Sequence, residues 1–256
     1  RRAARAVCLG VVDPETGERW LIDATPDLPS QLHDLNGLLA PKVRDLASIG
    51  VLLTHGHIGH YAGLMYLGRE AMGAQQVPVY GMPRMLRFLR EHGPWEQLCR
   101  LKNVELMELN HGRCVSLNAR ISIQPFVVPH RVEYTETVGM VISGPNRRVL
   151  YLTDIDRWER SSVSIESMLE GVDRAYLDGT FFDSGELPHR DPREIPHPLV
   201  SDSLKRFARL SEEVRSRICF VHFNHSNPLL QPQSAARQQV EDAGMSCARD
   251  GMIFSL

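Results

Sequence analysis

Three histidines lie within six residues of one another, at His55, His57 and His60, directly after the apolar run 51–53. In an extended chain the side chains of His55 and His57 point the same way, about 6–7 Å apart. A small bend at Gly56, which has no Cβ, lets both imidazoles reach one ion at the usual zinc–nitrogen distance of about 2.0–2.1 Å. A single histidine is more often a polar loop residue that bonds the backbone. Three at this spacing after a buried strand predict a metal site instead.

Further candidate ligands stand where other apolar, β-branched runs stop. They are His130 after residues 121–128, Asp154 after residues 149–153, and His222 after residues 218–221. If one sheet edge carries all of them, two sites can form. The first comprises His55, His57 and His130, and the second comprises His60, Asp154 and His222, with Asp154 able to bridge both. Taken alone, Asp154 also fits a turn and His130 a loop beside a proline, so the prediction depends on the coincidence of these strand ends.

Two other residues have chemistry that the site could use. Asp178 ends a further strand and is expected to accept the second ring proton of a ligand histidine, with a turn cap as the alternative. His225 lies three residues after His222, close enough to protonate a leaving group, with a solvated loop histidine as the alternative. We therefore expect Asp154 and His225 to be catalytic. We expect Asp178 to orient a ligand histidine without binding the metal itself.

The elements that must position these residues alternate along the whole chain. Strands are expected at residues 7–12, 20–22, 51–54, 77–80, 121–128, 138–142, 149–153, 175–177 and 218–221. Helices are expected at residues 28–39, 60–71, 83–92, 164–169, 200–210 and 234–243. The turn-rich segment 13–17 predicts a hairpin between the first two strands, and the proline-rich segment 185–198 predicts a long loop that shapes specificity. The pattern is that of an α/β protein with mixed sheets inside and helices outside.

Composition limits the classes of protein that this chain can represent. Of its 256 residues, 43% are hydrophobic, which is enough for one large core, and we expect a single domain over residues 1–256. The formal net charge of -2, with no run of five or more like charges, argues against a nucleic-acid partner, and no segment is typical of a membrane span. The five scattered cysteines predict free thiols. The chain starts without a methionine, so we expect a missing native start. A soluble protein, cytoplasmic or exported, is compatible with the sequence, and the oligomeric state is left open.

This set of candidate ligands resembles that of the metallo-β-lactamase superfamily, whose first motif reads H-x-H-x-D-H and whose later ligands are a His, an Asp and a His at strand ends. Within that superfamily, four segments are similar to the family of coenzyme PQQ biosynthesis B proteins: residues 22–27, 137–139, 177–181 and 222–230. The resemblance spans most of the chain. It implies an αββα sandwich of mixed sheets with helices outside and a metal site at one sheet edge.

One position departs from the superfamily motif. Gly59 stands where the motif has Asp, and glycine has no side chain to offer as a ligand. Either the second ion is held weakly by the remaining ligands, or the protein works with one ion, or the glycine opens space for substrate. The ligand set that remains is rich in imidazole and suits zinc, as one or two ions, with iron as the alternative.

The leading functional hypothesis is a metal-dependent hydrolase that uses a metal-bound hydroxide on an ester, thioester, amide or phosphoester. The substrate is expected to be a small molecule or a peptide. The resemblance to the PQQ biosynthesis proteins implies an alternative, an iron-dependent oxygenase or hydroxylase with the same ligands. A second alternative is a metal-binding protein without catalysis. No serine-hydrolase elbow or phosphate-binding P-loop occurs in the sequence.

Overall fold

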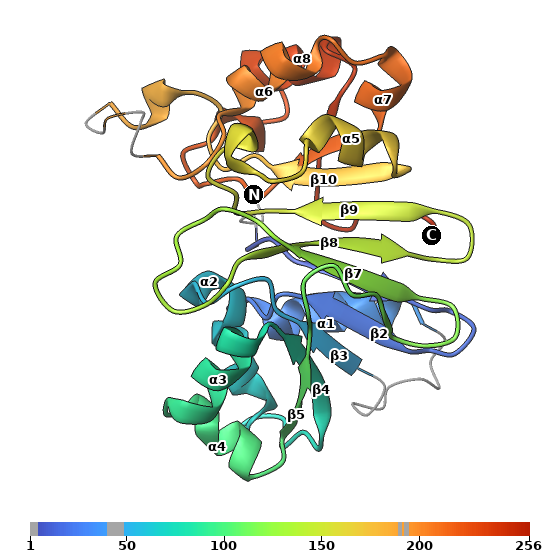
Figure 1. The fold of residues 1–256 in the computed structure, drawn as a ribbon, viewed down its shortest axis with the longest axis vertical. Helices are drawn as coiled ribbons and strands as arrows, with labels where there is room; N and C mark the ends of the chain where they lie inside the picture. The colour runs from blue at the N-terminus through green and yellow to red at the C-terminus, as the bar shows by residue number, and fades with distance from the viewer. Residues whose placement is uncertain (1–4, 40–48, 189–190, 192–194) are drawn as a thin grey trace. The chain divides into compact units, whose positions relative to one another are not determined.

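The computed structural model describes residues 5–39, 49–188, 191 and 195–256, and Figure 1 traces the order of the elements. The chain divides into two compact units: unit 1 comprises Cys114–Arg131 and Thr137–Leu256, and unit 2 comprises Arg5–Arg113 and Val132–Glu136. The single domain expected from the sequence stays a prediction. The first four residues of the chain, and residues 189–190 and 192–194 of the predicted loop, lie outside the described residues.

Unit 2 is built on a five-stranded sheet of order β1-β2-β3-β4-β5. Its strands are β1 (Leu9–Val12), β2 (Arg19–Ile22), β3 (Ile49–Leu52), β4 (Val77–Gly81) and β5 (Val104–Glu108). β1 and β2 form the predicted antiparallel hairpin, whose turn is closed by a 2.8 Å hydrogen bond from Gly17 N to Asp13 O. β2 to β5 run parallel, so their carboxyl ends meet at one edge of the sheet.

Helices of unit 2 bury their apolar stripes against this sheet. They are α1 (Leu28–Gly37), α2 (Ile58–Tyr61), the 3-10 helix η2 (Ala62–Leu67), α3 (Pro83–Glu91) and α4 (Trp95–Arg100). Both α1 and α3 carry proline in the first turn, where its missing N–H is tolerated. Met85 and Leu89 of α3, one turn apart, are buried in one core with Val79 of β4.

Unit 1 is built on a seven-stranded sheet of order β12-β11-β10-β9-β8-β7-β6. Its strands are β6 (Val115–Ser116), β7 (Ser122–Val127), β8 (Val138–Ser143), β9 (Arg148–Leu152), β10 (Arg174–Asp178), β11 (Ile218–Val221) and β12 (Ser246–Cys247). β7, β8 and β9 alternate in direction, whereas β9 to β12 are parallel. It follows that β7, β9, β10 and β11 all end at the same edge of this sheet.

The helices of unit 1 gather on one side of its sheet (Figure 1). They are η3 (Trp158–Arg160), α5 (Ile165–Glu170), η4 (Ser184–Glu186), α6 (Val200–Phe207), α7 (Glu212–Ser216), η6 (Pro228–Leu230) and α8 (Ala235–Asp242). The hydroxyls of Ser211 and Ser234 cap the first turns of α7 and α8. Phe207 and Phe220 are fully buried in the core beneath them. Truncation of either ring to alanine would cost about 3–5 kcal/mol.

The nine expected strands are present, and so are five of the six expected helices, with ends shifted by a few residues. The expected helix 60–71 is wrong in detail, because α2 already begins at Ile58 and gives way to a 3-10 turn and then to irregular chain. Within the 3-10 turn, Gly63 passes so close to the Thr25 carbonyl that a Cβ there would collide with it, so only glycine fits. The sequence analysis missed β5, β6, β12, α4 and α7, which are short or rich in charged residues.

All five cysteines are free thiols, as expected. None of the described helices is long and apolar enough to cross a membrane.

Candidate metal centre

In unit 2, the carboxyl ends of β2 and β3 bring a buried aspartate beside the histidine motif. Asp23 follows β2 directly, and its backbone N–H donates to Leu52 O, at the end of β3. The Asp23 side chain is fully buried and accepts hydrogen bonds from the Thr54 backbone N–H at 2.9 Å and the Thr54 hydroxyl at 2.8 Å. Asp23 itself has φ of 71°, a left-handed conformation that a non-glycine residue adopts only when its surroundings enforce it.

His55 and His57 face each other as a pair of metal ligands would. His55 Nε2 lies 2.9 Å from His57 Nδ1, close to the separation of about 3.3 Å that two nitrogens take on one tetrahedral zinc. The ring nitrogens that point away each have an oxygen partner. His55 Nδ1 lies 3.0 Å from the Thr54 hydroxyl, and His57 Nε2 lies 3.1 Å from the Glu133 carboxylate. These partners favour the tautomers that keep a lone pair on the facing nitrogens.

His60 is the third member of this group. Its ring centroid lies 4.2 Å from that of His55, and its Nδ1 lies 2.7 Å from Asp23 Oδ2. The buried carboxylate of Asp23 therefore accepts a hydrogen bond from His60 and, through the Thr54 hydroxyl, orients His55. The sequence analysis missed Asp23, although it follows an apolar strand as the predicted ligands do and could have been found by the same rule.

In unit 1, three strands that end at the shared edge bring three predicted residues together. Asp154 lies two residues after β9, Asp178 is the last residue of β10, and His222 follows β11 directly. Because β10 lies between β9 and β11, Asp178 stands between the other two. His222 Nε2 is 3.3 Å from Asp154 Oδ2. Asp154 and His222 both have left-handed backbones, with φ of 58° and 62°, which turn their side chains away from the direction of the strand.

Asp178 is linked to His222, one of the predicted ligands, through an intermediate hydroxyl. The Thr180 hydroxyl donates to Asp178 Oδ1 at 2.7 Å and lies 2.8 Å from His222 Nδ1. Since its single proton goes to the carboxylate, the hydroxyl accepts the Nδ1 proton of His222. The lone pair of His222 is then on Nε2, on the side of Asp154.

His197 completes this group, and the sequence analysis did not single it out. It belongs to the predicted loop 185–198, which carries no periodic signal that would have placed it here. His197 Nδ1 lies 2.8 Å from Asp178 Oδ2 and 3.6 Å from Asp154 Oδ1. Burial alone would lower the pKa of His197, but the Asp178 carboxylate outweighs it and raises that pKa. In turn, burial would raise the pKa of Asp178, but the His197 charge and hydrogen bond lower it.

Asp154, Asp178, His197 and His222 together offer ligand atoms that all lie within 4.8 Å of one another. His130, in the same unit, stands beside this group. Its Nε2 is 3.8 Å from Asp154 Oδ1, and its Nδ1 is 3.2 Å from Asp156 Oδ1. The association of His130 with His55 and His57, and of His60 with Asp154 and His222, stays a prediction from the sequence.

His225, the predicted proton donor, is exposed on the loop after β11 and lies outside this group of four. Its role also stays a prediction.

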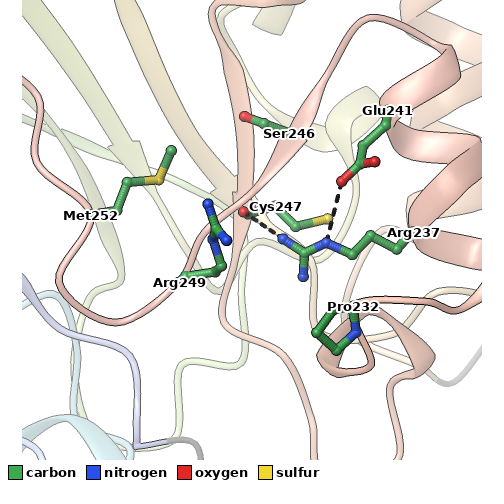
Figure 2. Close-up of a pocket in the computed structure, with 7 residues that line it drawn as sticks. All are labelled: Pro232, Arg237, Glu241, Ser246, Cys247, Arg249 and Met252. Atoms are coloured by element: carbon green, nitrogen blue, oxygen red, sulfur yellow. Dashed lines mark hydrogen bonds and ion pairs between the residues drawn. The ribbon is translucent and has the colours of Figure 1, made fainter.

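A cavity of about 250 Å³ in unit 1 contains none of the predicted ligands (Figure 2). Its central side chain, Arg237, is held by the carbonyls of Leu229 and Cys247 and by the Glu241 carboxylate, and so pins α8 to its neighbours. Burial raises the pKa of the Cys247 thiol in its wall to about 12, which keeps that sulfur protonated near neutral pH. The cavity is therefore a packing feature of the C-terminal segment.

A family model described as the beta-lactamase superfamily domain matches residues 18–223 of the chain. Curated relatives include the coenzyme PQQ synthesis protein B of Methylorubrum extorquens strain PA1, which is 27% identical over 96% of this chain and 86% of its own length. The protein of the same name from Methylobacterium nodulans is 29% identical over the same shares.

Solved structures with the same fold carry several functions. The Zn²⁺-bound PqqB from Methylobacterium extorquens has a TM-score of 0.80 at 22% identity, over 98% of this chain and 88% of that chain. A diphosphatase of the PhnP family has a TM-score of 0.61 at 24% identity, over 94% and 81%. Human tRNase Z, short form, has a TM-score of 0.61 at 17% identity, over 98% and 92%. The predicted fold class, that of the metallo-β-lactamases with mixed sheets and helices, is confirmed.

Proposed function

This chain belongs to the beta-lactamase superfamily, and from that membership we propose that it is a metal-dependent hydrolase acting on an ester, thioester, amide or phosphoester. The proposed metal is zinc, as one or two ions. The proposed ligands are those that the sequence indicates: His55, His57, His60, His130, Asp154 and His222. Structural neighbours that include a diphosphatase and a tRNase support hydrolysis as the reaction class.

The hydrogen bonding of the histidines is the observation that carries this proposal. In every one of the five proposed ligand histidines, one ring nitrogen lies within 3.2 Å of a carboxylate or hydroxyl oxygen. Histidines that bind metals almost always donate their second N–H in this way, because the donation fixes the tautomer and the ring orientation. The same hydrogen-bonding pattern in all five rings is better explained by metal binding than by five unrelated polar contacts.

A bound ion would lower the pKa of a coordinated water toward about 7 and polarise the oxygen of the scissile group. The protein's own groups would complete the site. Asp154, on its left-handed backbone after β9, would orient the attacking water through its carboxylate. His197, which is nine-tenths buried and held on Asp178, would carry the proton for the leaving group, a role that the sequence analysis gave to His225.

An iron-dependent oxygenase or hydroxylase is the second candidate. Asp154, His197 and His222 form a set of two histidines and one carboxylate within unit 1, the set that suits an iron with open positions. The relatives named coenzyme PQQ synthesis protein B support this candidate, since their name describes biosynthesis rather than hydrolysis.

Metal content measured by plasma mass spectrometry, on protein purified without added metal or chelator, separates these candidates. About two zinc ions per chain and turnover of ester or phosphodiester substrates would support the hydrolase. Iron, with oxygen consumption in the presence of a reductant, would support the oxygenase. Bound metal without either activity would indicate a metal-binding protein. His57→Ala should lose metal and turnover together, whereas His33→Ala, at an exposed position of α1, should lose neither.

A further inference from the structure

Three large apolar side chains of unit 2 are exposed around His57. Ile58 follows it directly and is 71% exposed, and Val132 and Tyr134 are 55% and 63% exposed. The last two flank Glu133, whose carboxylate contacts His57 Nε2. Single exposed apolar residues need no explanation, but a group of them beside a candidate site marks an interaction surface. We refer to Ile58, Val132 and Tyr134 as the apolar rim.

The segment that carries two members of the rim is fixed in place by hydrogen bonds. The Thr135 hydroxyl accepts a 2.7 Å hydrogen bond from the backbone N–H of Gly56, inside the histidine motif. Arg84, at the start of α3, donates from its side chain to Val132 O at 3.2 Å and from its backbone N–H to the Glu136 carboxylate. These bonds hold Val132 and Tyr134 at a fixed distance from the motif, as a binding surface requires.

Aromatic contacts connect the rim to the core of unit 2. The Tyr134 ring lies 5.8 Å from that of Phe88, which in turn lies 5.3 Å from Tyr61. Tyr61 is one helical turn after Ile58 and also contacts Trp95. Tyr134 therefore rests on a rigid aromatic layer and presents the rest of its ring to solvent.

The space beside Gly59 is open, and the charged groups named beside the rim, Glu133, Glu136 and Arg84, all have protein partners. Apart from its chain neighbours and the backbone of its own helix, no described atom of unit 2 comes within 4 Å of the place where a Cβ on Gly59 would stand. Gly59 stands where the superfamily motif has an aspartate, so residue 59 itself contributes no charge. The nearby carboxylates of Glu133 and Glu136 are engaged by His57 and by the Arg84 backbone.

The geometry points to a substrate that carries an apolar group beside the bond to be cleaved, and the apolar rim is the surface that binds this group. This inference rests on the proposed function, because the rim matters only if substrate reacts at the neighbouring metal. The open space at Gly59 leaves room for the group beside Ile58, and the exposed Tyr134 ring offers it an aromatic surface. An aromatic ring is the best match, since it stacks on Tyr134 and fills more of the rim than a methyl group.

Two hydroxamates that differ only in their apolar part test this inference. Both acetohydroxamate and benzohydroxamate bind zinc, and only benzohydroxamate has a ring for the rim. Isothermal titration of the full-length, zinc-loaded protein should give a dissociation constant roughly tenfold lower for benzohydroxamate, from burial of the ring. The double variant Val132→Ser, Tyr134→Ser should lose that preference with zinc content unchanged. Tyr134→Phe should keep it, and so should Val163→Ser, a matched change at another exposed valine.

The outcomes separate the rim from the metal site. Equal binding of the two hydroxamates to the unaltered protein would overturn the rim and leave the hydrolase proposal intact. Tighter binding of benzohydroxamate by a folded double variant would likewise overturn the rim and leave the hydrolase proposal intact. Failure of both probes to bind a zinc-loaded protein would overturn both proposals. If the double variant does not fold, Tyr134→Ser alone provides the comparison.

Discussion

Asp23 and Asp178 occupy equivalent positions in the two units. Each lies at the carboxyl end of a parallel strand, is fully buried, and takes a threonine hydroxyl on one carboxylate oxygen and a histidine Nδ1 on the other. The threonines are Thr54 and Thr180. Their hydroxyls also contact Nδ1 of a second histidine, which is His55 in unit 2 and His222 in unit 1. Each unit thus contains the same four-residue arrangement, and each arrangement prepares a proposed ligand.

The first prediction concerns these two hydroxyls. Thr54→Val and Thr180→Val keep the shape of the side chain but remove the hydroxyl that accepts the hydrogen bond of His55 Nδ1 or His222 Nδ1. Each should weaken zinc binding about 10- to 100-fold, the usual cost of losing an outer partner. Competition titration against a chromophoric zinc chelator measures the change. Thr54→Ser and Thr180→Ser should restore most of the affinity, and equal loss in the serine and valine variants would contradict the role of the hydroxyl.

The second prediction decides between two proton donors. His197→Gln keeps a hydrogen bond to Asp178 but carries no transferable proton, so kcat should fall about 10²- to 10⁴-fold at unchanged zinc content. His225→Gln should reduce kcat much less, because that residue is exposed and lies outside the described group of ligand atoms in unit 1. Steady-state kinetics on the best substrate of the ester and phosphodiester panels provide both values. The reverse order of effects would return the role to His225.

The third prediction concerns the position where the motif lacks its carboxylate. Gly59→Asp has room for its side chain, since no described atom of unit 2 outside its own helix and chain neighbours lies within 4 Å of the new Cβ. The added oxygen ligand should raise occupancy of the second ion toward one per chain at substoichiometric metal. Plasma mass spectrometry after dialysis measures it, with Gly59→Asn as the uncharged control. Unchanged occupancy would mean that the missing carboxylate does not limit the second ion.

The fourth prediction concerns stability in acid. The Arg206 guanidinium, which hydrogen-bonds Glu166, lowers the pKa of Glu166 from 4.5 to about 2, against a smaller opposing effect of burial. Because the folded pKa is below the unfolded one, this pair stabilises the fold above pH 4.5, and the contribution is lost as pH falls toward 2. Glu166→Gln should therefore lower stability by about 1 kcal/mol at pH 7, given that the pair is partly exposed.

Urea unfolding at several pH values measures this contribution. The difference between the original protein and Glu166→Gln should shrink between pH 4.5 and pH 2. Glu170→Gln, at the end of the same helix, is the matched control and should change little. A difference that does not depend on pH would show that packing, not charge, underlies the effect.

The positions of the candidate residues at strand ends could be predicted from sequence because one local rule describes them all. An apolar run that stops at a histidine or carboxylate identified His130, Asp154, Asp178 and His222 before any topology was known. Parallel pairing of the strands then brings the last three to one edge, as expected. The rule applies equally to Asp23, which directly follows the apolar strand β2.

The partners that lie in loops could not be predicted in this way. His197 and Glu133 sit in segments with no hydrophobic period, and only the folded chain brings them to Asp178 and His57. Their positions depend on long-range contacts such as that between Thr135 and Gly56, 79 residues apart. Sequence spacing carries no information about such pairs.

The short segment Val132–Glu136 has a consequence for how the gene can be divided. It belongs to unit 2, although the residues on both sides of it belong to unit 1. A fragment that stops at Arg113 would contain the three histidines of the motif but not Glu133 or Thr135, the partners of His57 and Gly56. Unit 2 therefore cannot be produced intact by one truncation. A split version of this protein would need the segment grafted back, or both fragments expressed together.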